Sequence, residues 1–298
     1  MTYSIAIAGT TDRTKLCTEA LFNHPQFEIS LIITPDAKPI GRKKILTSSP
    51  LKEFADSNQV QTVLVKNKID ESTRKQILAH KKPDFLLVVD FGYLVPNWLL
   101  DLPQIMPLNI HPSALPKWRG SSPGQFVLLS GAEKSAVSII EMTAKFDQGP
   151  VVWQEEFAVN PNWTQTEYYQ HSFQLVTEHL AEVILQLAEK KITPTPQPLT
   201  SPTPLARKIK KADTFVKWEE IEAAMATDKN SAVHLERASR AYSPWPLLWT
   251  EIETNKGQKR MQIISTRVEK SGLLNLEKVK IEGMDIKPWV EVKNVIRD

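Results

Sequence analysis

Residues 106–120 read MPLNIHPSALPKWRG, and this stretch decides where the fold places its polar groups. It begins as an apolar run typical of a buried strand, and Pro112 and Pro116 then bound a turn. Asn109 and His111 are two residues apart, so on a strand their side chains point to the same face. The stretch therefore predicts a strand that ends by presenting an amide and an imidazole side by side.

Four similar apolar runs precede this strand and predict the rest of a sheet. Helix-like segments lie between them, and one begins with Ser49 as a cap and Pro50 in the first turn. Strands that alternate with helices predict a doubly wound α/β sheet, in which ligands bind beyond the carboxyl ends of the strands. The four runs are SIAIAG (4–9), ISLIIT (29–34), TVLV (62–65) and FLLVVD (85–90).

The chain after this sheet divides at a proline-rich segment. Two further strands at 136–142 and 150–159 precede one long amphipathic helix over 164–191. Five prolines between Pro194 and Pro204 then predict an extended linker. Beyond it, four short strands at 246–254, 259–270, 273–282 and 289–296, with one or two helices, predict a small β-barrel. The expected organisation is thus a domain over 1–192, a linker over 193–204 and a second domain over 205–298.

Composition excludes several classes of protein. The 298 residues are 41% hydrophobic and 24% charged, as in ordinary globular proteins. No apolar run approaches the roughly 18 residues of a membrane span, and the amino terminus lacks the pattern of a signal peptide. The single cysteine, Cys17, excludes an internal disulfide and predicts a reducing, cytoplasmic location. No metal site, dinucleotide fingerprint or phosphate-binding loop is found in the sequence.

A third polar residue, Asp147, follows the strand at 136–142 in the turn KFDQGP. A histidine is often structural and a turn aspartate often ordinary, but an Asp brought to a His can orient it and stabilise its charged form. Asn109, His111 and Asp147 around one cleft suit acyl-type transfer, with the amide and imidazole on an oxyanion and the carboxylate managing a proton. Ser113 and Cys17, the available nucleophiles, do not lie in a nucleophile elbow, so direct transfer is favoured.

At this point the chain resembles the folate-dependent formyltransferase family. NIHPSALPKWRGSSPGQ is similar to the family's Asn-x-His signature, and MTAKFDQGPVV is similar to its aspartate-containing second part. Further segments at 41–55, 82–96, 205–218 and 237–250 resemble the methionyl-tRNA formyltransferase branch. The resemblance implies a Rossmann-like α/β domain that binds 10-formyltetrahydrofolate, followed by a small OB-like β-barrel domain. It implies transfer of the formyl group to the methionine amino group of initiator Met-tRNA, without a metal and by a monomer.

The resemblance also assigns residues to each ligand. Asn109, His111 and Asp147 match the catalytic positions. The chain departs from the family pattern at Ala114, at Gln148 and after the first strand, where a usual proline and aromatic are missing. The folate contacts expected from the resemblance are Ser113, Ala114, Leu115, Pro116, Phe91, Gly92 and Tyr93.

Two basic runs are either solvated surface or contacts to tRNA phosphates. Residues 205–298 carry 18 Lys and Arg against 14 Asp and Glu, an excess of +4 that weakly favours a polyanionic partner. The basic residues expected to bind tRNA are Arg42, Lys43, Lys44, Arg207, Lys208, Lys210 and Lys211.

Three other functions stay open from the sequence. A sugar-nucleotide N-formyltransferase would use the same donor and polar trio, but it has no need of the basic run at residues 42–44. A formyl-folate hydrolase would use water in place of the amine. A catalytically inert nucleic-acid-binding protein is disfavoured by the intact trio.

Overall fold

A computed structural model of the protein describes residues 1–40 and 44–296. These residues form two compact units that interleave along the chain. Unit 1 comprises residues 1–119, 136–156 and 170–203, and unit 2 comprises residues 120–135, 157–169 and 204–298.

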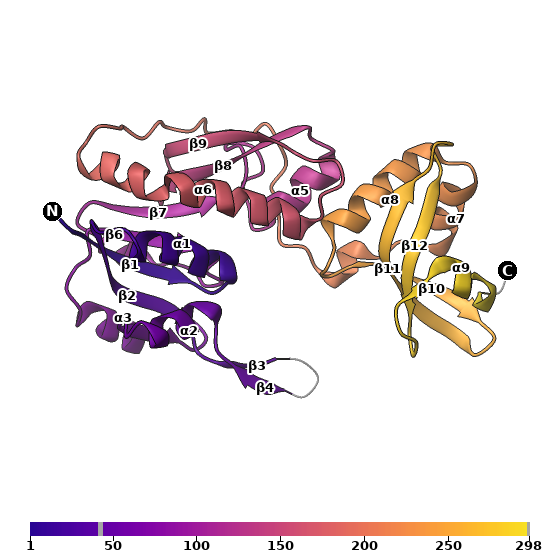
Figure 1. Ribbon diagram of the computed structural model, residues 1–298, viewed down its shortest axis with the longest axis horizontal. Coiled ribbons are helices and arrows are strands. Elements are labelled where there is room, and N and C mark those ends of the chain that lie inside the picture. The colour runs from indigo at the N-terminus through magenta and orange to yellow at the C-terminus, as the bar shows by residue number, and fades with distance from the viewer. Residues whose placement is uncertain (41–43, 297–298) are drawn as a thin grey trace. The chain divides into compact units, whose positions relative to one another are not determined.

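Unit 1 is built on a seven-stranded sheet in the order β5-β2-β1-β6-β7-β8-β9 (Figure 1). The first five strands in this order, which end with β7, are parallel to one another, and β8 runs antiparallel to β7. The five apolar runs predicted as buried parallel strands are confirmed. The strands are β1 (Tyr3–Gly9), β2 (Phe27–Pro35), β5 (Thr62–Val65), β6 (Phe85–Val89), β7 (Met106–His111), β8 (Lys134–Glu141) and β9 (Val151–Ala158).

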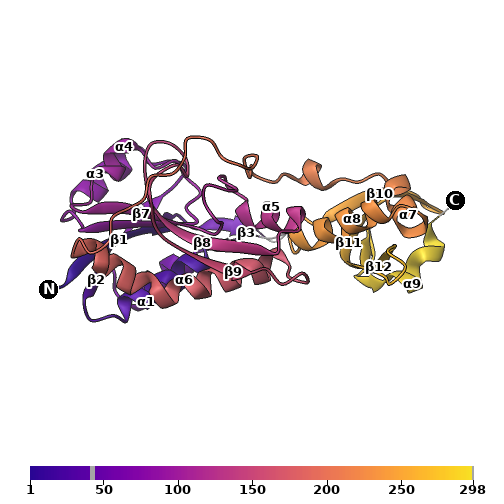
Figure 2. The same cartoon turned by 90° about the horizontal axis from the view of Figure 1, so that it is seen from above.

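Helices cover both faces of this sheet. Figure 2 shows α3 (Glu71–Leu78) and α4 (Asn97–Leu100) on one face, and α1 (Asp12–Phe22) and α6 (Gln165–Ala188) on the other. Ile77 of α3 and Leu99 of α4 are buried against alternate residues of β1, β2, β5 and β6. The period of two along each strand therefore assigns one set of side chains to each layer.

Local capping explains where the helices begin. Ser49 accepts a hydrogen bond from the Lys52 amide at 3.1 Å, which caps α2 (Pro50–Ser57) as predicted. A capping box begins α6, because the Thr164 amide and hydroxyl both donate to Glu167 Oε2 at 2.8 Å. Each device satisfies amide groups that the first helical turn leaves without a partner.

A small antiparallel hairpin, β3 (Lys38–Ile40) and β4 (Ile45–Thr47), follows β2 in the chain and precedes α2. Ile45 and Leu46 are exposed on it. Arg42 and Lys43, two of the predicted tRNA contacts, lie outside the described residues, and Lys44 is exposed just before β4.

Unit 2 contains a four-stranded antiparallel sheet in the order β10-β11-β12-β13. Three of the four predicted strands are confirmed. The fourth prediction, a strand over 289–296, is wrong, because Trp289 and Val292 are buried as one turn of helix. The alternation of apolar and polar residues there fits a short helix with two inward positions as well as a strand. The elements are α5 (Pro123–Ser130), η1 (Lys211–Thr214), α7 (Trp218–Ala226), α8 (Lys229–Ala241), β10 (Leu248–Thr254), β11 (Gly257–Val268), β12 (Leu274–Ile281), β13 (Lys287–Pro288), α9 (Trp289–Val292) and η2 (Lys293–Val295).

Two segments that precede the proline-rich stretch also belong to unit 2. The Ser122 amide donates to Ala206 O at 3.0 Å, and Gln165 Nε2 donates to Trp245 O at 2.7 Å. These contacts explain why residues 120–135 and 157–169 group with the carboxyl-terminal part. The sequence predicts one domain before residue 193 and another after residue 204, whereas each observed unit consists of several segments of the chain. That the two predicted domains fold independently stays a prediction.

The fold class predicted from sequence is confirmed as a Rossmann-like α/β unit accompanied by a smaller antiparallel β unit. Within residues 1–40 and 44–296, no helix is both long and apolar enough to cross a membrane.

Candidate active site

Strand β7 carries Asn109 and His111 to the carboxyl edge of the parallel strands. The Asn109 amide nitrogen donates to Val88 O on the neighbouring strand β6 at 2.9 Å, which fixes the side chain while leaving one N–H and the amide oxygen for a ligand. His111 is the last residue of β7 and is only 4% exposed. The predicted placement of both residues at a strand end is confirmed.

Asp147 lies next to His111 although 36 positions separate them in the chain. Its Oδ2 atom is 3.6 Å from His111 Nδ1, and both side chains are almost fully buried. The backbone of Asp147 is left-handed, with φ at +53°. Gly149 follows, and a Cβ there would lie 1.8 Å from Glu141 O. The loop therefore needs a glycine at 149 in order to fold back toward His111.

The second nitrogen of His111 determines what the pair can do. Nε2 lies 3.1 Å from Trp118 O, and because a carbonyl only accepts, this nitrogen carries a hydrogen. Nδ1 then faces Asp147 Oδ2, an acceptor that can orient the ring and exchange a proton with it. The distance exceeds that of a hydrogen bond, but catalytic contacts often tighten when substrate binds. The pair is suited to accept and return one proton.

The turn after His111 is built mainly by contacts within unit 1. The Ser113 hydroxyl donates to Lys117 O at 2.8 Å, and Gln154 Nε2 donates to Leu115 O at 3.0 Å. Among the four residues predicted to contact folate here, Ser113 and Leu115 are buried, whereas Ala114 and Pro116 are partly exposed. The last two have surface for a ligand, and the first two shape the turn. Their folate contacts stay predictions.

The loop after β6 contains the other predicted folate contacts. The Phe91 and Tyr93 rings lie 5.3 Å apart between centroids, and the Tyr93 hydroxyl accepts from Lys38 Nζ at 3.0 Å. Gly92 is exposed, with no heavy atom within 4 Å of where a Cβ would be. The loop thus pairs two anchored rings with an open glycine between them.

Asp90, at the start of this loop, is a site residue that the sequence reasoning missed. Its backbone is left-handed, with φ at +47°. Its Oδ2 atom accepts from Thr11 Oγ1 at 2.8 Å and from Arg13 Nε at 2.5 Å, which joins the loops after β1 and β6. An Asp directly after a buried strand is the one sequence signal that points to it.

Neither candidate nucleophile is available for covalent catalysis. Ser113 is fully buried and engaged with Lys117 O. Burial raises the pKa of the Cys17 thiol far above its ordinary value, so the thiol stays protonated. Both observations favour direct transfer, as predicted from the sequence.

The predicted basic residues of unit 2 lie on an exposed segment. The Arg207 guanidinium donates twice to the Asp213 carboxylate, at 2.7 Å and 2.9 Å. This pairing lowers the pKa of Asp213 from 3.8 to about 2. Lys208, Lys210 and Lys211 are exposed. The three lysines can therefore meet a polyanion directly, whereas Arg207 is already neutralised by Asp213.

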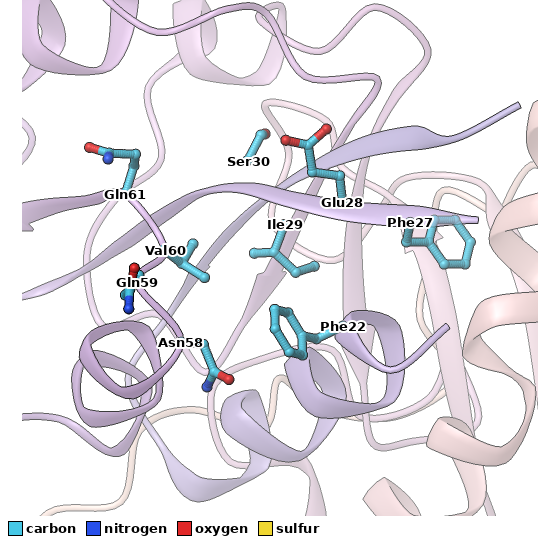
Figure 3. A pocket seen from close by; sticks show the side chains of 9 residues that line it. All are labelled: Phe22, Phe27, Glu28, Ile29, Ser30, Asn58, Gln59, Val60 and Gln61. Carbon is cyan, nitrogen blue, oxygen red and sulfur yellow. The ribbon is translucent and has the colours of Figure 1, made fainter. Parts of the chain in front are cut away.

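A separate pocket lies at the amino-terminal ends of β2 and β5 (Figure 3). Phe22, Glu28 and Asn58 are among the residues that line it, and no predicted site residue is among them. Ligands of doubly wound sheets bind at the opposite, carboxyl edge. We therefore do not assign the pocket to the active site. Over the described part of the chain, no group of three His, Cys, Asp or Glu residues is placed to hold a metal ion.

Comparison with known proteins points to one family. The profile of the formyl transferase family matches residues 2–184. A methionyl-tRNA formyltransferase of Idiomarina loihiensis is 32% identical over 263 residues, which are 87% of this chain and 78% of that protein. Among solved structures, a methionyl-tRNA formyltransferase from Clostridium thermocellum aligns with a TM-score of 0.60 at 14% identity, covering 96% of this chain and 99% of that one. The sugar 3N-formyl transferase WlaRD aligns with a TM-score of 0.61 at 17% identity, covering 91% and 88%. The two structural scores are equivalent, so they show the fold and do not distinguish the acceptor.

Proposed function

The chain belongs to the formyl transferase family, and we propose that it transfers the formyl group of 10-formyltetrahydrofolate to the amino group of methionine on initiator Met-tRNA. The observation that carries the proposal is the buried His111–Asp147 pair beside Asn109, at the edge of the sheet where ligands of this fold bind. The choice of tRNA as acceptor rests on the similarity to a methionyl-tRNA formyltransferase over most of the chain.

The fit of a folate donor is supported by the surface around the trio. Ala114, Pro116 and Gly92 leave accessible surface on two loops, and Asn109 keeps an N–H for a ligand oxygen. The donor supplies an activated formyl group bonded to nitrogen.

The trio has two tasks in the proposed reaction, which are to stabilise the negative charge on the formyl oxygen and to carry a proton. Asn109 donates a hydrogen bond to the formyl oxygen as negative charge develops there during attack by the amine. His111, when protonated, adds positive charge beside the same oxygen. His111 and Asp147 hold the proton that the amine loses and return it to the folate nitrogen as the carbon–nitrogen bond to the donor breaks. One bond to nitrogen forms and one breaks, so no covalent enzyme intermediate is needed.

The basic residues are proposed to bind the phosphates of the tRNA. Arg42, Lys43 and Lys44 form one group, and Lys208, Lys210 and Lys211 form the other, with Arg207 contributing less because Asp213 holds it. The monomeric state and the cytoplasmic location stay predictions.

A direct test is a transfer assay with purified protein, 10-formyltetrahydrofolate and initiator Met-tRNA. The expected product is formyl-methionyl-tRNA, formed at a rate that depends on protein concentration. Uncharged initiator tRNA is the matched control, since it lacks the amine and should yield no formylated tRNA. Release of formate without formyl-methionine would instead support the hydrolase, and the proposed function would be rejected.

A further inference from the structure

Gln197 lies in the proline-rich segment and contacts the loop of Asp147. Its amide nitrogen donates to Asp147 O at 3.1 Å and to Gly149 O at 2.7 Å. Its amide oxygen accepts from Arg119 Nε at 3.1 Å and from Arg119 Nη2 at 2.8 Å. Two donors and two lone pairs are all that a glutamine amide offers, so its hydrogen-bonding capacity is fully used. The partners also fix its orientation, because a guanidinium only donates and a carbonyl only accepts.

Arg119, the partner on the other side, is buried with only 5% of its surface exposed. Besides Gln197 it donates to Pro198 O at 2.7 Å and to Leu199 O at 3.3 Å. All of these acceptors belong to one short segment of the chain. A buried guanidinium is costly without such partners, so the segment and Arg119 hold each other in place.

The same segment is anchored to the turn that carries His111. Thr203 Oγ1 accepts from the Trp118 amide at 2.7 Å, and Ser201 Oγ donates to Pro116 O at 2.8 Å. Trp118 also supplies the carbonyl that contacts His111 Nε2. Residues 197–203 thus form a strap, and this strap contacts both sides of the His111–Asp147 pair.

The Gln197 side chain bridges the two loops, because it joins the Arg119 guanidinium to the backbone carbonyls of Asp147 and Gly149. Asp147 is held in a left-handed conformation, and its carboxylate stands 3.6 Å from the imidazole. A small shift of its loop would therefore move the carboxylate away from the imidazole.

We propose that Gln197 is a positioning residue for formyl transfer, which acts by holding the Asp147 loop against His111. The kinetic part of this inference rests on the proposed function. The geometric part, that Gln197 sets the distance between the carboxylate and the imidazole, does not depend on the acceptor.

The test uses the full-length chain with two substitutions and one control. Gln197→Met keeps the length of the side chain and removes all four hydrogen bonds. Gln197→Glu keeps the pairing with Arg119 but places a second oxygen against the two carbonyls. Leu199→Ala is the control in the same strap, because its side chain is 85% exposed and its carbonyl is retained.

The first readout is nitrogen NMR of the protein labelled at histidine, with the His111 signal assigned from a His111 variant. In Gln197→Met and Gln197→Glu the Nδ1 signal of His111 should move, whereas Leu199→Ala should leave it unchanged. An unmoved His111 signal in both folded Gln197 variants would overturn the proposal, whatever the protein formylates.

The second readout is single-turnover transfer in a double-mutant cycle. Gln197→Met should lower the rate by about 10- to 100-fold while folate affinity changes less than about twofold, since misplacement near 1 Å can cost this much. Combined with Asp147→Asn, it should cause no further loss, because both changes remove the same carboxylate function. Losses that multiply in the double variant would show that Gln197 acts elsewhere and would overturn the proposal. Absence of any transfer by the unmodified chain would reject the proposed function and leave the NMR result as the test of Gln197.

Discussion

The polar corner at the end of β7 and the basic segment at residues 207–211 place charge in opposite ways. His111 and the Asp147 side chain are almost fully buried. The Trp118 carbonyl contacts His111, and the Gln197 amide donates to the Asp147 carbonyl, so both residues are held in one geometry. Lys208, Lys210 and Lys211 are exposed to solvent. The proposed role of the corner depends on the exact positions of its side chains, whereas the proposed role of the segment depends on how many positive charges it carries. Substitutions should therefore have large, non-additive effects in the corner and small, additive effects in the segment.

The largest effect is expected from the corner itself. His111→Ala and Asp147→Asn should each lower the single-turnover rate by about 10²–10⁴-fold, the usual range for a positioned proton-transfer group. Folate affinity, measured by calorimetry, should change little. His179→Ala is a matched control, because this half-exposed histidine pairs with Glu155 on the surface. Equal losses in the control and in His111→Ala would break the comparison.

Gly149→Ala tests whether the loop depends on shape. The added Cβ would lie 1.8 Å from Glu141 O, so the backbone carrying Asp147 must shift. We expect a rate loss on the order of 10²-fold and a stability loss of about 1–3 kcal/mol. Single-turnover transfer assays measure the rate loss, and urea denaturation measures the stability loss. Gly92→Ala, at a position where a Cβ meets nothing within 4 Å, is the control for stability. Unchanged activity in a folded Gly149→Ala protein would contradict the account of the loop.

A smaller effect is expected from the basic segment. Replacing Lys208, Lys210 and Lys211 together by alanine should weaken tRNA binding and reduce the log–log salt slope by about one unit per lost phosphate contact. Transfer from the bound complex should stay near the unmodified rate. The control is a second triple variant, in which alanine replaces the exposed residues Lys75, Lys81 and Lys82 of unit 1, so that the same net charge is lost. If both triple variants change the slope equally, the segment contributes only net charge.

The smallest effect concerns the ion pair that occupies Arg207. Arg207 lowers the pKa of Asp213 from 3.8 to about 2, so the pair stabilises the folded state above about pH 4. As pH falls from 4 toward 2, the carboxylate is protonated in the folded state and the contribution is lost. Asp213→Asn should therefore lower the melting temperature slightly at pH 7, since exposed pairs contribute little, and the difference from the unmodified chain should shrink steadily as pH falls from 4 through 2. A difference that stays constant over this range would mean that Asp213 acts through something other than its charge.

Much of unit 1 could be predicted from the sequence because its signals are local. Apolar runs of four to six residues predict the parallel strands, and Ser49 marks where a helix begins. The strand period placed Asn109 and His111 on one face. The meeting of Asp147 with His111 rests on the chemistry of the two side chains and on the family resemblance, since no local pattern encodes a contact across 36 positions.

The role of the proline-rich segment could not be predicted in the same way. Its five prolines indicate an extended chain and suggest a spacer, but they say nothing about partners. Gln197 reaches Asp147 and Arg119 across separations of 50 and 78 residues. Such contacts depend on where the tertiary fold brings the loops, and a lone glutamine between prolines gives no sign of them.

Competition between two acceptors separates formylation of tRNA from formylation of a sugar. The protein is given 10-formyltetrahydrofolate with equal concentrations of initiator Met-tRNA and an amino sugar nucleotide, and mass spectrometry identifies which amine carries the formyl group. We expect formyl-methionyl-tRNA as the main product of the unmodified chain and its loss in His111→Ala. Formyl groups found mainly on the sugar nucleotide would show that tRNA is not the acceptor.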